Sequence, residues 1–264
     1  MFEGPTSDIC AVCARAAGVL DAAAAALSRA YFEESLLSIE RSRGDVYYAA
    51  FSAMGSRALG GGLGDLEGYL RSLDFSSFDL PHLASFARCA NISGAGFGGL
   101  ASAVERAVAR TPYEVFLKSG ALCDCGIPQG GETGLAGLER FCAPGGYSNI
   151  PGAPFAGANA TSAALAALAY SGSPEAAGCA FLLREMQEPC GGFRAEPGSP
   201  HPDLLTTACA LFALGISGVE PRFCARDFAA AHWAGDGSFC ASICEDRGDC
   251  EYALYGILAL GACA

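Results

Sequence analysis

The chain repeats a glycine turn followed by an aromatic residue, as Gly145-Gly146-Tyr147, Gly191-Gly192-Phe193 and Gly237-Ser238-Phe239. The three aromatic residues stand 46 residues apart twice in succession. The same interval continues beyond the turns, since Leu165 returns as Leu211 and then as Ile257. A period of this length indicates a supersecondary unit that is repeated along the chain.

Each unit is predicted to contain two helices separated by the glycine turn. The first opens with Ser173-Pro174-Glu175, where a capping serine, a proline and an acid favour a helix that runs to about Gln187. The second begins at Asp203, a plausible N-cap, and stops at Gly215. It is apolar nearly all round and should be buried, whereas the first carries charge on one side, as at Arg184, and should face solvent.

Buried helices of the second kind are expected to begin near Asp45, Asp79, Pro112, Asn159, Asp203 and Asp249. A single hairpin cannot bury its inner face alone, so hairpins of this kind pack against their neighbours. We therefore predict one all-α domain over residues 1–264. Its architecture would be an α/α toroid of about six inner and outer helical hairpins that close around a central apolar cavity. An open solenoid of the same hairpins is the alternative.

Composition excludes several partners. The 264 residues include 16 Lys and Arg against 28 Asp and Glu, and the net charge of -12 repels nucleic acid and anionic lipid surfaces. The apolar stretch from Leu204 to Ile216 is too short to span a bilayer, so no membrane insertion is expected. Fourteen cysteines are fewer than a small disulfide scaffold would have, and Met1-Phe2-Glu3-Gly4 does not resemble a secretory signal. We expect a reduced, cytoplasmic protein.

Four stretches together resemble the β-subunits of protein prenyltransferases, especially those of the Rab geranylgeranyl type. They are Ser38–Tyr48, Asp79-Leu80-Pro81-His82-Leu83, the segment from Gly191-Gly192-Phe193 to Pro202-Asp203, and Asp249–Ile257. The stretches keep the repeat order of that family and cover most of the chain. The resemblance implies a β-subunit that pairs with a helical α-subunit and binds a prenyl diphosphate in an apolar central funnel. It would transfer the isoprenoid to a cysteine at the C-terminus of a target protein.

The resemblance also implies a zinc ion that holds the acceptor cysteine as a thiolate. The family ligands are an Asp, a Cys two residues later and a His in the last repeat. Here the Asp matches Asp203, while Leu205 stands at the Cys position and Tyr252 at the His position. Asp203 is thus the candidate metal ligand, and Asp203, Tyr252 and Asp249 are the candidate catalytic residues. Neighbouring groups that could complete a metal site are His201, Cys209, Cys250 and Glu251.

The candidate substrate-binding residues are Arg194, His201, Tyr48, Phe193 and Phe155. Phe155 falls where the family has a histidine for the diphosphate, and Arg194 would replace the family's arginine. Phe193, like the other repeat aromatics, could line an isoprenoid pocket or could pin one hairpin to the next, and the second role is more common at such a turn.

Three alternatives stay open at this point. A catalytically inactive toroid would bind a lipid or a partner protein, and the aspartates that open the buried helices would then serve only as N-caps. A terpene-cyclase-like enzyme would need an acid where Leu205 stands. An enzyme acting on sugars or hydrocarbons would need paired carboxylates, for which Asp246, Asp249 and Glu251 are the candidates.

Overall fold

The computed structural model describes residues 4–128, 135–243, 245 and 247–264. Within these ranges the regular structure is helical apart from one small antiparallel sheet, formed by β1 (Cys142–Ala143) and β2 (Gly146–Tyr147). The predicted all-α class is confirmed.

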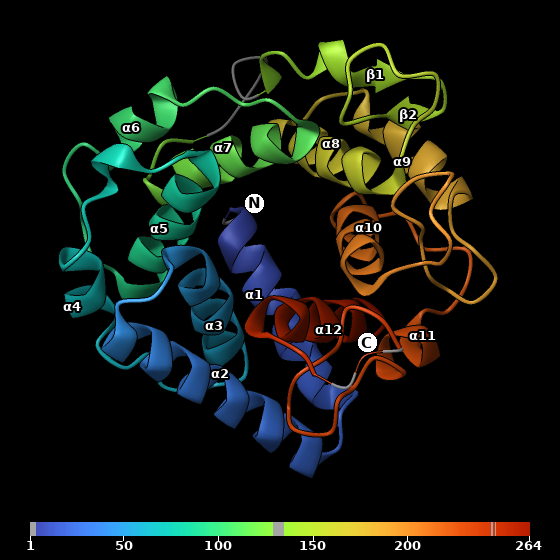
Figure 1. The fold of residues 1–264 in the computed structure, drawn as a ribbon. Coiled ribbons are helices and arrows are strands. Elements are labelled where there is room, and N and C mark those ends of the chain that lie inside the picture. Colours follow the sequence, from blue (N-terminus) through green and yellow to red (C-terminus); the bar gives the residue numbers. More distant parts are fainter. Residues whose placement is uncertain (1–3, 129–134, 244, 246) are drawn as a thin grey trace.

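Six buried helices begin where the sequence predicts them. They are α3 (Val46–Ala58), α5 (Leu80–Ser93), α7 (Pro112–Asp124), α8 (Ala158–Ser171), α10 (Leu204–Ile216) and α12 (Cys250–Ala262). We call them the inner helices, and Figure 1 shows them arranged about a common centre. Each packs against the next in chain order, and α12 packs against α3, so the contacts return to their start.

Aspartate caps fix four of these starts. Asp45, Asp79, Asp203 and Asp249 each accept a hydrogen bond from a backbone N–H in the first turn of the helix that follows. Such a cap satisfies one of the N–H groups that a helix start leaves unpaired, and the carboxylate charge favours the positive end of the helix dipole. The interpretation of these residues as N-caps is confirmed.

The outer helices are less regular than the inner ones. They are α2 (Ala22–Ser42), α4 (Leu66–Arg71), α6 (Leu100–Arg106), α9 (Ala176–Glu185) and α11 (Arg226–Ala230), with 3-10 turns at Ala16–Gly18 and Phe75–Ser77. The expectation of a helical partner for every inner helix is wrong before α8, where described residues 135–157 contain the 3-10 turn Glu139–Phe141 and the sheet. Gly145 and Gly146 both have positive φ, which favours a tight hairpin and not a helix.

The repeat aromatics hold the hairpins together. Tyr147 and Phe193 are buried, and their backbone N–H groups donate to Thr161 and Thr207, which lie 14 residues further on in each unit. Phe239 is fully buried and forms bridges to Trp233 and Asp249. The 46-residue period therefore marks a structural joint between each turn and the inner helix after it.

Helix α1 (Pro5–Arg15) was not anticipated from the sequence. It packs against α12, α3 and α7, and Figure 1 places it at the centre of the inner helices. Thr6 Oγ1 donates to Asp124 Oδ2 at 2.8 Å, and Tyr170 Oη donates to Asp8 Oδ2 at 2.8 Å. Asp124 and Tyr170 lie at the C-terminal ends of their helices, so α1 covers that end of the assembly.

Gly261 allows the closest approach of α1 to α12. A Cβ atom at this position would overlap the carbonyl oxygen of Val12, which is backbone and cannot rotate away. We expect Gly261→Ala to lower the free energy of unfolding by about 2–3 kcal/mol, measured by urea denaturation. Gly215→Ala in α10 is the control, because a Cβ there meets nothing within 4 Å and should stabilise by at most about 1 kcal/mol. Equal changes in the free energy of unfolding at both glycines would contradict close packing of α1 against Gly261.

The carboxyl group of Asp124 should make stability depend on pH. Burial raises the pKa of Asp124 from 3.8 to about 6, although hydrogen bonds from Thr6 and Asn91 and the charge of Arg88 oppose the shift. The folded state then binds the proton more tightly, so this contribution is complete below pH 3.8 and is lost as the pH rises to about 6. Relative to Asp124→Asn, the wild type should lose on the order of 3 kcal/mol across that window. A difference between the two proteins that does not vary with pH would contradict this assignment.

Candidate functional site

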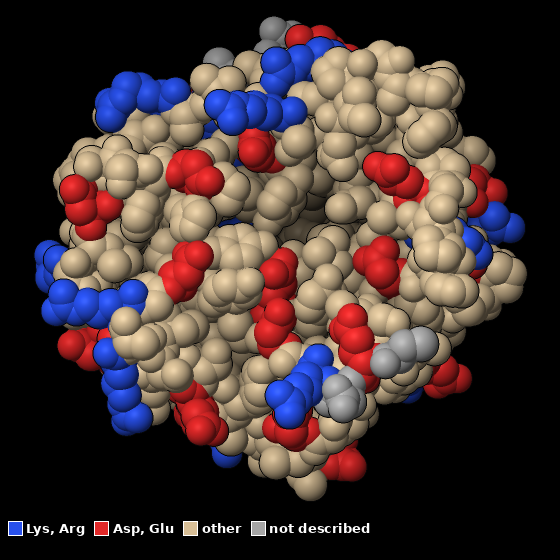
Figure 2. All heavy atoms as spheres, viewed as in Figure 1, with Lys and Arg blue, Asp and Glu red and all other residues tan. Residues whose placement is uncertain are grey.

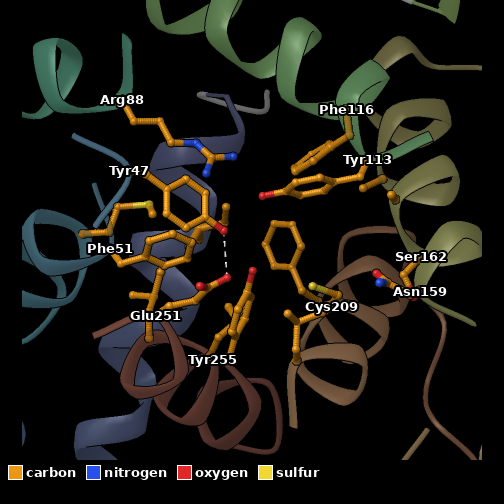
Figure 3. Close-up of a pocket in the computed structure, with 18 residues that line it drawn as sticks. Tyr47, Phe51, Arg88, Tyr113, Phe116, Asn159, Ser162, Cys209, Glu251 and Tyr255 are labelled. Atoms are coloured by element: carbon orange, nitrogen blue, oxygen red, sulfur yellow. Dashed lines mark hydrogen bonds between the residues drawn. The ribbon is translucent and has the colours of Figure 1, made fainter. Parts of the chain in front are cut away.

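A cavity of about 150 Å³ lies between the inner helices. Most of its walls are apolar, and Figure 3 shows side chains from several inner helices pointing into it. Ile9 of α1 contributes to the same lining. Because α1 covers the C-terminal ends of the inner helices, the opening faces their N-terminal ends.

The lining residues occupy recurring positions after the residue that caps each inner helix. Two, six and nine residues after the cap come Tyr47, Phe51 and Met54 on α3, Leu205, Cys209 and Phe212 on α10, and Glu251, Tyr255 and Leu258 on α12. A spacing of three to four residues keeps side chains on one helical face. The cavity is therefore the place where one face of each inner helix meets the others.

Tyr47 and Glu251 form a polar bridge inside the cavity. Tyr47 Oη donates to Glu251 Oε1 at 2.8 Å and joins α3 to α12 (Figure 3). Burial raises the pKa of Glu251, the hydrogen bond from Tyr47 lowers it, and the charge of Asp249 raises it further. Burial also raises the pKa of Tyr47, so the phenol is the donor and the carboxylate the acceptor.

Arg88 of α5 contributes the single basic side chain among the residues that line the cavity. Its exposed fraction is 6%, and it forms no hydrogen bond, ion pair or cation–π contact with any residue in the described part of the chain. Figure 3 shows its guanidinium group pointing toward the cavity. A guanidinium group does not deprotonate in a protein, so this charge is buried in its ionised form.

The remaining polar groups of the cavity are neutral. Burial raises the pKa of Tyr113 to about 12 against the opposing charge of Arg88, and it raises the pKa of Cys209 to about 12. Cys209 therefore remains a thiol, which is a weak nucleophile and a weak metal ligand. Tyr255 is buried and also keeps its proton.

Acidic groups surround the opening. Figure 2 shows acidic side chains around a hollow at the centre of this face, and the exposed caps Asp45, Asp79 and Asp249 lie at the N-terminal ends of the inner helices. His82 joins two of the caps, with Nδ1 2.5 Å from Asp79 and Nε2 3.3 Å from Asp45. Burial lowers the pKa of His82, but the two carboxylates outweigh it and the pKa is raised. The acidic groups at the opening therefore disfavour molecules that carry several negative charges.

The predicted catalytic residues lie at the rim of the assembly and are not among the cavity-lining residues. Both carboxylate oxygens of Asp203 accept bonds from Thr206, one from the backbone N–H at 2.7 Å and one from the hydroxyl at 2.9 Å. Asp249 is exposed and caps α12 by accepting from the N–H of Tyr252. Tyr252 is half-buried beside Tyr255.

The predicted substrate-binding residues are also absent from the lining of the cavity. Arg194 pairs with Glu188 and donates to the carbonyls of Ser199 and Pro200. Phe193 is fully buried in its hairpin. The other three residues reach the surface, with Tyr48 40% exposed, Phe155 44% exposed and His201 also exposed.

The residues at the predicted zinc position do not fit the ion. Leu205 has no donor atom, and the oxygens of Asp203 are engaged by Thr206. Cys250 Sγ donates to the carbonyl of Tyr48. Among the residues with assigned positions, no group of three or more His, Cys, Asp or Glu side chains could hold a metal ion.

Asp246, proposed as part of a carboxylate cluster, lies outside the described residues. The other two members diverge, because Asp249 caps its helix at the surface while Glu251 points into the cavity.

Comparison with known proteins finds no counterpart: no family model, curated protein or solved structure matches this chain. The resemblance to prenyltransferase β-subunits therefore rests on the short stretches quoted above. In the described ranges, no helix combines the length and the apolar character needed to cross a membrane.

Sequence reasoning missed Tyr47, Arg88, Tyr113 and Tyr255 as cavity residues. The signal that could have found them is the spacing from the predicted helix start, since Tyr47 stands two residues, Tyr255 six and Arg88 nine after their caps. The stretches that resemble the prenyltransferase family instead contain the caps, which lie closer to solvent than the cavity residues.

The Tyr47–Glu251 bridge predicts a pKa change that one variant can test. Tyr47→Phe removes the hydrogen bond that lowers the pKa of Glu251, so that pKa should rise further above its ordinary value. Carboxyl ¹³C shifts of Glu251, followed by NMR across pH, measure the change. Tyr255→Phe is the matched control, because it lines the same cavity without bonding to Glu251, and an equal shift in both variants would count against the bridge.

Proposed function

We propose that this chain is an α/α toroid that binds a compact, largely apolar small molecule in its central cavity. The cycle of helix contacts that returns from α12 to α3 supports the toroid. The observation that carries the function is the cavity itself, which is enclosed by inner helices, floored by α1 and lined mainly by apolar side chains. Concave apolar sites with a few polar groups are the usual form of small-molecule sites.

The size of the cavity bounds the ligand. A volume of about 150 Å³ suits a molecule near the size of an aromatic ring and is too small for a long isoprenoid chain. This geometry supports the interpretation of a ligand-binding toroid better than the interpretation of a prenyltransferase.

The prenyl-transfer reaction implied by the resemblance has less support. It requires a metal-bound thiolate, and the side chains of Leu205 and Asp203 do not fit that role. It also requires positive charge aimed at a departing diphosphate, whereas Arg194 is engaged by Glu188 and the opening carries acidic caps. The terpene-cyclase alternative requires an acid at the position of Leu205, and a leucine side chain cannot donate a proton.

A cavity-filling substitution tests the proposed function. Ala166 lines the cavity and is buried on α8, so Ala166→Leu should occupy the space and weaken binding of toluene at least about tenfold without loss of stability. Ala177→Leu on the exposed face of α9 is the matched control and should leave binding unchanged. Two-dimensional NMR titration gives both affinities and the shifted residues. If Ala166→Leu leaves the affinity for toluene unchanged, the ligand binds outside the cavity and the proposal is refuted.

A further inference from the structure

The unpartnered charge of Arg88 is the feature of the cavity that the structure leaves unexplained. Its guanidinium group has five N–H donors, the residue as a whole is 6% exposed, and no described residue accepts a hydrogen bond from it. Removing such a charge from water without a partner is costly, and proteins normally pair buried charges. A group that completes these hydrogen bonds from inside the cavity would remove that cost.

Two acidic residues of the interior, Asp124 and Glu251, do not fill this role. Asp124 lies close enough for Arg88 to lower its pKa, but its oxygens accept from Thr6 and Asn91, each at 2.8 Å. Glu251 faces the same cavity, but its bond goes to Tyr47. Arg88 is therefore left with donors that point toward the cavity (Figure 3).

We propose that the cavity selects a small monocarboxylic acid with a compact apolar body, whose carboxylate binds the guanidinium group of Arg88. This inference rests on the proposed function, because it names the ligand class for the same cavity. A carboxylate matches the planar fork of a guanidinium group with two parallel hydrogen bonds. The apolar walls around it, among them Phe116, Phe212 and Leu258, would receive the body of the acid.

The charge count favours a monoanion over a phosphate ester or diphosphate. The cavity has one cation and one carboxyl group, and its opening carries the aspartate caps of a chain with net charge -12. A second or third negative charge would have no cation to pair with in a site of low dielectric. The hydroxyl of Tyr113, which lies near that of Tyr47, also lines the cavity and would donate to the second carboxylate oxygen.

Calorimetric titration with three matched probes tests the ligand class. We expect phenylacetate to bind the wild type at least about tenfold more tightly than the neutral isostere phenylacetamide, because only the acid pairs with Arg88. Dimethylallyl diphosphate should bind more weakly than phenylacetate. Equal affinities for the acid and the amide, or tighter binding of the diphosphate, would overturn the proposal.

Variants of Arg88 test the residue. Arg88→Met should weaken phenylacetate binding by about 10- to 100-fold and leave phenylacetamide within about threefold, while Arg88→Lys should retain part of the preference for the acid. Arg57→Met on α3 is the matched control, since Arg57 is exposed and should change neither affinity. A loss of both ligands in Arg88→Met to the same extent would refute a charge-specific role.

Stability without ligand separates a binding role from a structural one. An unpartnered buried charge destabilises, so ligand-free Arg88→Met should melt at or above the temperature of the wild type. A melting temperature lowered by more than about 5 °C would show that Arg88 is held by internal partners and would overturn the proposal. Toluene distinguishes failure of the ligand class from failure of the proposed function. If toluene binds but phenylacetate binds no more tightly than phenylacetamide, only the monocarboxylate ligand class is refuted. If none of the probes binds, the proposed binding function of the cavity is refuted as well.

Discussion

The architecture depends on one constraint: most residues of each inner helix are buried, so each inner helix must be covered on more than one side. The outer helices cover one side, and several of them are short. The other side is covered by neighbouring inner helices and by α1, which reaches α12 because Gly261 has no side chain to keep the Val12 carbonyl away. Protein interiors are closely packed and contain few voids larger than a water molecule. A cavity of about 150 Å³ between the inner helices is therefore a specific feature of this fold.

The same constraint separates the charges of the molecule. Carboxylates gather at the N-terminal ends of the inner helices, where they cap the backbone and complement the helix dipoles. Deeper positions are apolar because they face other helices. Among the residues that line the cavity, Glu251 and Arg88 carry the acidic and basic groups that depart from that pattern, and of these two only Glu251 has a hydrogen-bond partner among the described side chains. In the proposed ligand site, the contrast between an acidic opening and the cavity's single cation would determine the selectivity.

The sequence predicted the inner helices well because their signals are local. A capping residue followed by an apolar run specifies a helix start without reference to the rest of the fold, and the 46-residue period repeated that signal. Such local signals could not predict how α1 packs, the small sheet before α8 or which residues line the cavity. They depend on how far each helix is rotated about its axis, which is decided by packing between segments distant in the sequence. Tyr47 and Glu251, 204 residues apart, illustrate the point.

Arg88 also links the two ends of the inner-helix assembly. Its charge lowers the pKa of Asp124, the residue that accepts from Thr6 and so anchors the start of α1. An anion that neutralises Arg88 would remove this effect and make Asp124 easier to protonate, and by linkage the protonation of Asp124 would change the affinity for the anion by the same factor. If the cavity binds an anion as proposed, its occupancy and the packing of α1 would thus be coupled through the Asp124 carboxyl group and the Arg88 guanidinium group.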